Sequence, residues 1–176
     1  MIEGGKGGAR TLTGLNFERK ADLKQKFEQI KDYGVKGDDL FYRGRIIASF
    51  YGKYELYNKL LLKYNIRWED KISKRWLPDE AILVLTNNTL FIIEMKFQKV
   101  GGSVDEKLQT CDFKKKTYQK LLSGTGIKVE YCYILSKWFM QKQYKDTLDY
   151  IEFVGCKFFF ERLPLRYLGL PDPNSP

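Results

Sequence analysis

The chain has 176 residues, 43% of them hydrophobic, so it is long enough to form one domain with a sizeable core. Its formal net charge is +9, and such a basic excess favours a polyanionic partner, nucleic acid first, although simple solubility is an alternative explanation. Because there is no histidine, histidine–metal sites, Ser-His and Cys-His nucleophile pairs and histidine-dependent nucleases are excluded.

The cysteines and the hydropathy indicate the expected compartment. Cys111, Cys132 and Cys156 are odd in number and far apart, which fits buried thiols in a reducing compartment rather than a disulfide framework or a zinc site. No stretch is apolar and long enough to span a membrane, and the N-terminus has no signal-peptide h-region. We therefore expect a cytoplasmic protein without a membrane partner.

The N-terminal part predicts a flexible arm followed by a helix. Residues 1–13 are rich in glycine, which is typical of a flexible segment. Residues 14–33 predict a helix that ends before Gly34, a typical stop signal. Its apolar residues at helical spacing are Leu23, Phe27 and Ile30.

Residues 38–52 predict an irregular hairpin or loop that contains Arg43 and Arg45. Arginine can donate two hydrogen bonds to guanine, so both are candidates for contact with a DNA groove, and solvated loop charges are an equally good interpretation. Residues 53–64 predict a second helix. The apolar stripe of that helix is Leu56, Leu60, Leu61 and Tyr64.

Residues 77–98 predict the β-hairpin around which the rest of the chain is organised. Residues 81–85 and 90–97 are rich in β-branched and aromatic side chains, and Asn87 and Asn88 between them are a typical turn pair. The two segments therefore predict antiparallel strands joined by a tight turn.

The register of this hairpin brings polar side chains together at one end. If the strands are symmetric about the turn, Glu94 lies opposite Ala81, and Lys96 lies opposite Asp79. Because side chains alternate between faces, Asp79, Glu94 and Lys96 then share one face, and Gln98 lies on it too. The other face of the second strand is wholly apolar. We expect a strand that is buried on both sides and becomes polar only at its end. The alternative is an exposed Glu-x-Lys on an edge strand, but an edge strand should not be apolar on both faces.

Two carboxylates and an ammonium group at one point have a clear chemical use. Paired carboxylates repel each other and favour a divalent cation, and hard oxygen ligands suit Mg²⁺. A metal ion of this kind can polarise a phosphodiester and activate a water molecule, and a lysine can orient that water or stabilise the developing charge. The carbonyl of Met95 is a candidate for a further ligand.

A third helix is predicted after the hairpin, with a capping box at residues 103–106. Its apolar stripe is Val104, Leu108, Cys111, Tyr118 and Leu122. Lys115 interrupts this stripe, and the lysine run 114–116 either contacts phosphate or forms a solvated face.

The C-terminal part predicts a strand at 127–135, a fourth helix that ends at Gly155, a last strand at 156–163 and a loose tail at 171–176. The apolar positions of the fourth helix are Met140, Tyr144, Leu148 and Ile151. The element order fits a single α/β domain at 14–170, with a mixed central sheet flanked by helices. The helix after the hairpin implies that the next strand lies parallel to the second hairpin strand.

Pro78-Asp79, followed after fourteen residues by Glu94-Met95-Lys96, resembles the PD-(D/E)XK motif of the restriction-endonuclease-like nucleases. The resemblance covers about residues 14–135 and implies the core fold of that family. It implies that Asp79 and Glu94 bind Mg²⁺, for which Mn²⁺ would substitute. It also implies that Lys96 positions or activates the attacking water.

The resemblance extends to helper residues. The segment from Gly14 resembles the first helix of many such nucleases, where a glutamate sometimes joins the metal site, so Glu18 is a candidate ligand and Glu55 is a second. A solvated glutamate in a first helical turn is the alternative for Glu18. In these nucleases the helix after the motif faces DNA, and Lys107 and Gln109 match it by position. The expected DNA-binding residues are Gln98, Lys107, Gln109, Lys114, Lys116, Arg43 and Arg45.

The expected function is that of a Mg²⁺-dependent type II restriction endonuclease, a homodimer that cleaves duplex DNA at a palindromic target. A restriction enzyme is favoured because the chain is small and contains no ATP-binding glycine loop. A structure-specific nuclease of the same fold, of the Holliday-junction-resolvase type, is the second interpretation. A non-catalytic DNA-binding module is the third, and a binding protein for acidic partners is the fourth.

Overall fold

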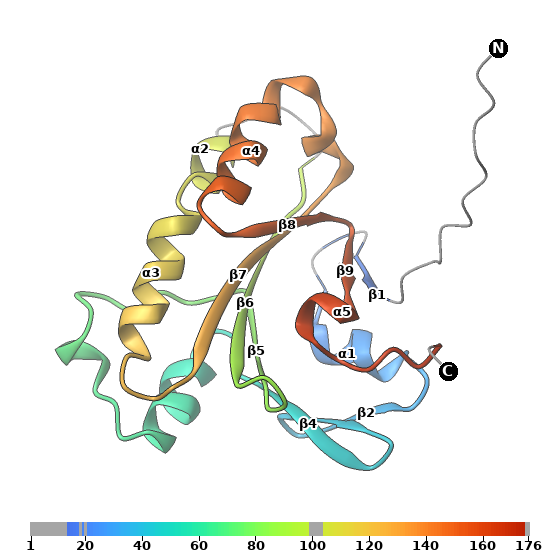
Figure 1. Cartoon of the computed structure of the whole chain (residues 1–176), viewed down its shortest axis with the longest axis vertical. Helices are drawn as coiled ribbons and strands as arrows, with labels where there is room; N and C mark the ends of the chain where they lie inside the picture. The colour runs from blue at the N-terminus through green and yellow to red at the C-terminus, as the bar shows by residue number, and fades with distance from the viewer. Residues whose placement is uncertain (1–13, 18, 20, 99–103, 175–176) are drawn as a thin grey trace.

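The computed structural model describes residues 14–17, 19, 21–98 and 104–174 (Figure 1). The expected N-terminal arm at 1–13, the candidate ligand Glu18 and the first residue of the expected capping box, Ser103, lie outside these residues.

A seven-stranded mixed sheet forms the centre of the molecule, with strand order β2-β3-β4-β5-β6-β7-β8. The strands are β2 (Tyr33–Lys36), β3 (Asp39–Tyr42), β4 (Arg45–Phe50), β5 (Glu80–Val84), β6 (Thr89–Lys96), β7 (Lys128–Leu135) and β8 (Lys157–Phe160). Neighbours from β2 to β6 are antiparallel, whereas β6, β7 and β8 are parallel. This confirms the α/β class, the mixed sheet and the predicted parallel neighbour of the second hairpin strand.

Helices cover both faces of this sheet (Figure 1). One face carries the π-helical turn η1 (Leu56–Leu61), α2 (Val104–Leu108), α3 (Cys111–Leu121) and α4 (Lys145–Phe153). The other face carries α1 (Leu23–Glu28), α5 (Leu165–Leu168) and a small sheet of β1 (Gly14–Asn16) and β9 (Arg162–Pro164). Short 3-10 turns, η2 (Trp68–Asp70), η3 (Lys137–Met140) and η4 (Lys142–Tyr144), complete the elements.

The strand β6 separates two hydrophobic cores. Its side chains at Leu90 and Ile92 pack into the core beneath α3, and those at Phe91, Ile93 and Met95 pack into the core beneath α1. Both faces of β6 are therefore covered, as the apolar pattern predicted. Because β6 lies between β5 and β7, Glu94 at its end does not lie on an edge strand.

The predicted first helix is wrong at both ends. Gly14–Asn16 is a strand that pairs with β9, and the helix itself is only Leu23–Glu28. The side chain of Asp22 caps this helix by accepting hydrogen bonds from the backbone N–H groups of Lys24 and Gln25. Asp32, with φ of 67°, then turns the chain into β2 before Gly34 is reached.

The third and fourth predicted helices are each divided. Gln109 and Thr110 separate α2 from α3, although Leu108, Cys111, Tyr118 and Leu122 are buried as expected. Met140 lies in a 3-10 turn before α4 and is 62% exposed, so it is not part of the apolar stripe. In the second helix, Tyr64 is likewise exposed. The expected last strand breaks at Glu161, whose φ is 52°, into β8 and β9.

Lys115 lies on the apolar stripe of α3 because its ammonium group has partners there. Its Nζ atom is 2.9 Å from Glu130 Oε2 and donates to the carbonyl of Gly155 at 2.8 Å. The expected tail begins at Pro171, whose carbonyl accepts a hydrogen bond of 2.6 Å from the Tyr33 hydroxyl.

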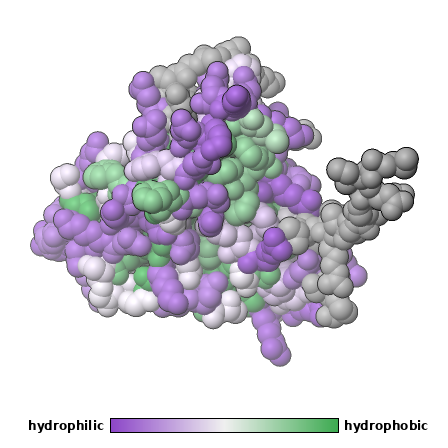
Figure 2. Space-filling model, turned by 45° about the horizontal axis from the view of Figure 1, so that its top comes forward, coloured by the Kyte–Doolittle hydropathy of each residue, from purple (hydrophilic) through white to green (hydrophobic). Residues whose placement is uncertain are grey.

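The surface seen in Figure 2 is mostly hydrophilic, with hydrophobic residues in separate patches. All three cysteines are buried free thiols, as predicted. Within the part of the chain that the structure describes, no helix has the length and apolar character needed to cross a membrane.

Candidate active site

The hairpin of β5 and β6 has a different register from the one predicted. Val84 pairs with Thr89, so the loop comprises residues 85–88 and includes Asn88 at φ of 49°. Because Glu80 pairs with Ile93, the next position places Asp79, rather than Ala81, level with Glu94. The predicted pairing was wrong by two residues, and a shift of two keeps every side chain on its predicted face.

Asp79, Glu94 and Lys96 meet at the end of this hairpin. Asp79 Oδ2 accepts a hydrogen bond of 3.0 Å from the backbone N–H of Met95, which fixes it beside β6. Lys96 Nζ lies 2.8 Å from Glu94 Oε2 and 3.6 Å from Asp79 Oδ2, so one ammonium group contacts both carboxylates. Glu94 is only 5% exposed, so burying its carboxylate without such partners would be costly.

A second lysine reaches the same carboxylate from α3. Lys114 Nζ lies 3.5 Å from Glu94 Oε2, and the Lys114 side chain is 18% exposed. Lys114 is one of the expected DNA-binding residues, but the sequence did not indicate that it reaches Glu94. Helix packing distinguishes it, because α3 turns Lys114 toward the end of β6 while Lys116 is 70% exposed and pairs with Asp112.

Buried tyrosines hold the segment that leads to Asp79. The hydroxyls of Tyr57 and Tyr118 donate to the carbonyl of Trp76 at 2.8 and 3.0 Å, and the Trp76 N–H donates to the Tyr57 hydroxyl. Burial raises the pKa of Tyr118, and the charges of Glu94 and Asp79 raise it further. Tyr118 therefore stays protonated and remains a hydrogen-bond donor.

Asp79 opens onto a hollow of about 290 Å³ that sequence reasoning did not find. It is lined by Ala21, Asp22, Lys53, Asp79, Glu80 and Met95. Burial raises the pKa of Glu80 to about 7, although a hydrogen bond from the backbone N–H of Leu23 opposes this rise. Asp22 could have been found from its position as a helix N-cap. Glu80 has no local signal, because its burial depends on how α1 packs.

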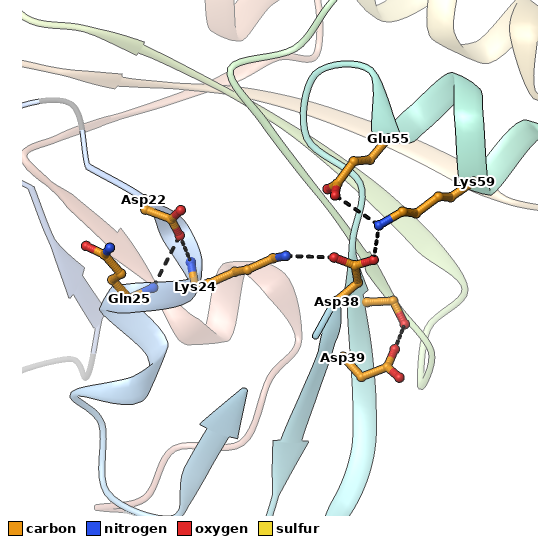
Figure 3. A network of polar contacts seen from close by, with 8 residues as sticks. Asp22, Lys24, Gln25, Asp38, Asp39, Glu55 and Lys59 are labelled. Carbon is orange, nitrogen blue, oxygen red and sulfur yellow. Dashed lines mark hydrogen bonds and ion pairs between the residues drawn. The ribbon is translucent and has the colours of Figure 1, made fainter. Parts of the chain in front are cut away.

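Figure 3 shows the polar network beside this hollow. Asp38 lies between Lys24 of α1, at 2.7 Å, and Lys59 of η1, and hydrogen bonds from Lys24 and then Lys59 lower the pKa of its carboxyl group. Lys59 also pairs with Glu55 at 3.0 Å (Figure 3). Glu55, a candidate metal ligand, lines a hollow with Asp79 but is engaged by this lysine.

The donor set for a metal ion is small. Among the described residues, no group of three or more acidic or cysteine side chains is arranged to hold a metal ion. Mg²⁺ does not require such a group, since it is commonly bound by one or two carboxylates, with waters and substrate phosphates as its other ligands. Asp79 and Glu94 fit this requirement.

The remaining predicted DNA-binding residues lie in different places. Lys107 and Gln109 are exposed at and just after the end of α2. Gln98 lines a separate hollow of about 770 Å³, where its backbone N–H donates to Ser136 Oγ. Gln98 does not line the hollow of about 290 Å³ that contains Asp79, nor the hollow that Asp79 shares with Glu55.

Arg43 and Arg45 lie at the other end of the sheet from the candidate site. Phe50, at the end of β4, pairs with Ile82 near Asp79, whereas Arg45 begins β4 and Arg43 precedes it in the turn. Six residues of strand separate these ends by about 17 Å. The fold therefore places Arg43 and Arg45 away from the candidate site, and their contact with a DNA groove stays a prediction.

No protein-family model matches the chain, and the search of curated proteins found no significant match.

Proposed function

We propose that the chain is a metal-dependent DNA endonuclease with a restriction-endonuclease-like core. The observation that supports this most is the meeting of Asp79 and Glu94 at the end of a buried hairpin, with Lys96 Nζ in contact with both carboxylates. A non-catalytic DNA-binding module is a poorer explanation, because two carboxylates at this position would only repel phosphate.

In this proposal Asp79 and Glu94 hold Mg²⁺ or Mn²⁺. When bound, the ion would polarise the scissile phosphodiester and favour ionisation of the attacking water. The hydrogen bond from Met95 N–H fixes the Asp79 carboxylate, which would be one of the two carboxylates that hold the ion.

The two lysines supply positive charge from different directions. Lys96 is placed to orient the attacking water, since its Nζ atom lies between the carboxylates. Lys114 is placed to stabilise the charge that develops on the phosphate oxygens, because it approaches Glu94 from α3. Both ammonium groups also offset the cost of burying the Glu94 carboxylate.

Cleavage of both strands of a duplex by this single site per chain needs two chains. We therefore propose a homodimer, and a type II restriction enzyme is the first assignment to test. Unmethylated phage DNA should be incubated with Mg²⁺ or with EDTA, beside Lys96→Ala and the control Lys145→Ala, whose lysine is exposed on α4. Discrete fragments that require Mg²⁺, are lost in Lys96→Ala and persist in Lys145→Ala are expected.

Metal binding is tested separately from activity. Mg²⁺ or Ca²⁺ should raise the thermal stability of the wild-type protein but not of a Glu94→Gln variant, because only the native state holds the two-carboxylate site. An equal response in both proteins would contradict the assignment of Glu94 as a ligand.

A structure-specific nuclease is the second candidate. The specific observation in its favour is a group of aromatic side chains near Asp79, which includes Tyr54 and Trp76.

A further inference from the structure

Four aromatic residues form a surface beside the candidate active site, which we call the aromatic rim. Tyr54 and Phe113 are 53% and 58% exposed, and the other two members are half-buried against the core beneath α3. The rim consists of Tyr54, Trp68, Trp76 and Phe113. Single exposed aromatic side chains are common on protein surfaces, but a group of four next to a catalytic candidate is not explained by packing alone.

The rim adjoins Asp79 through Tyr54, and its other members are linked to the candidate site through neighbouring residues. Tyr54 lines a hollow of about 370 Å³ together with Asp79. Trp76 precedes Asp79 by three residues, and its ring meets that of Phe113 at a centroid distance of 5.5 Å and an angle of 72°. Phe113 in turn precedes Lys114, which contacts Glu94.

Cationic side chains lie among these rings. The guanidinium carbon of Arg75 is 5.6 Å from the centre of the Tyr54 ring and 5.3 Å from that of Trp68. Lys74 Nζ lies 4.4 Å from the centre of the Trp76 ring. Aromatic faces interleaved with Arg and Lys are the combination that binds unpaired nucleotides, because the rings stack on bases and the cations attract the phosphates.

The rim is also held in place before any ligand arrives. The backbone of Trp76 is fixed by the buried hydroxyls of Tyr57 and Tyr118. The Trp68 ring packs edge-on against Tyr57 at 6.3 Å. A fixed surface of this kind loses little conformational entropy when a base stacks on it.

We propose that the substrate has unpaired nucleotides beside the scissile phosphate and that the aromatic rim stacks on their bases. In an intact duplex the faces of the bases are already stacked on one another, so exposed rings have no base to contact. Unpaired bases at a fork, flap or junction present their faces directly. The inference rests on the proposed nuclease function but favours its second candidate, the structure-specific nuclease, because it names the substrate class as branched or partly single-stranded DNA.

The binding test uses the full chain in EDTA with two oligonucleotide substrates of the same sequence. One is fully paired, and the other is a splayed-arm DNA that carries 2-aminopurine in the unpaired nucleotides next to the junction. The wild-type protein should bind the splayed-arm DNA more tightly and quench its 2-aminopurine fluorescence. Phe113→Leu, which keeps an apolar side chain but removes the ring, should weaken this binding by about fivefold or more, the loss expected for one base stack.

Two matched variants separate stacking from a structural effect. Phe113→Tyr keeps a ring and should retain both affinity and quenching. Phe153→Leu removes an 87% exposed ring on α4, outside the rim, and should bind as the wild type does. Binding of the fully paired DNA should be unchanged in all three variants.

Cleavage with Mg²⁺ distinguishes failure of this inference from failure of the nuclease assignment. Preferential cutting near the junction would support both. If the paired duplex is cut as fast as the splayed-arm DNA, and Phe113→Leu binds the splayed-arm DNA as the wild type does, the role of the rim is overturned. The nuclease assignment would then remain intact. Ring-dependent binding without cleavage of either DNA would support the rim and overturn the nuclease assignment.

Discussion

Lys114 Nζ lies 3.5 Å from the same oxygen of Glu94 that Lys96 Nζ contacts at 2.8 Å. The two lysines come from different elements, α3 and β6, so the position of the helix determines part of the charge at the end of the strand. The two ammonium groups offset the cost of burying this carboxylate, and the same groups are available to a phosphate.

Replacing Lys114 with methionine, which keeps much of the side-chain volume, should lower the rate of single-turnover DNA cleavage by about tenfold or more, because one donor to the developing phosphate charge is lost. It should also reduce the free energy of unfolding by about 1–3 kcal/mol, because Glu94 loses a partner in a buried position. Lys116→Met is the matched control, since this lysine is exposed and pairs with Asp112. Equal cleavage rates for the two variants would show that Lys114 has no special role.

Replacing Glu94 with glutamine should abolish cleavage while DNA binding in EDTA is retained or strengthened. The substitution removes a negative charge next to the scissile phosphate and leaves Lys96 and Lys114 without that carboxylate. Cleavage assays and fluorescence anisotropy with the same DNA measure the two effects. Glu152→Gln, at an exposed position of α4, is the control and should change neither cleavage nor binding. Normal cleavage by Glu94→Gln would refute the assignment of Glu94 to the site.

Much of the site could be predicted from the sequence because alternation along a strand is a local property. Asp79, Glu94 and Lys96 share a face in either register of the hairpin, so the error in the turn did not separate them. The loop itself depends on distant contacts, since the Asn87 and Asn88 side chains donate to the carbonyls of Leu168 and Gly126.

Apart from the helix N-cap Asp22, the features that sequence reasoning missed depend on packing between distant segments. Lys114 reaches Glu94 only because α3 packs against β7, the neighbour of β6. The strand β1 forms only because β9, near the other end of the chain, supplies its partner. The hydrophobic pattern of the segment concerned predicts neither relationship.

The ion pairs of Asp38 make stability depend on pH in the acid range. Hydrogen bonds from Lys24 and Lys59 lower the pKa of Asp38 in the folded protein. Its carboxylate therefore stabilises the fold above the ordinary pKa of about 4, and this contribution is lost as the pH falls through the lower folded-state value. Asp38→Asn should reduce the free energy of unfolding by about 0.5–1 kcal/mol at pH 7, a value limited by solvent screening.

At pH 2.5 the same substitution should have a smaller effect, because this pH lies below the ordinary carboxyl pKa of about 4, where the contribution of the lowered pKa of Asp38 is already reduced. Urea unfolding of both proteins at the two pH values measures the difference. Asp149→Asn is the control, since its ion pair with Lys145 lies on the surface of α4 and should contribute little at either pH. A pH-independent effect of Asp38→Asn would exclude the ion pairs as its cause.

A Gly14→Ala substitution tests the strand that replaces the start of the predicted helix. In the structure a Cβ atom at Gly14 would lie 2.7 Å from the backbone carbonyl oxygen of Leu163, which cannot move without disturbing β9. The substitution should therefore destabilise the protein by about 1–3 kcal/mol. In a helix, alanine in place of glycine would have the opposite effect and stabilise by about 1 kcal/mol. Gly34→Ala is the matched control, because no atom lies within 4 Å of a Cβ added there, and thermal unfolding of the two variants should shift only for Gly14→Ala.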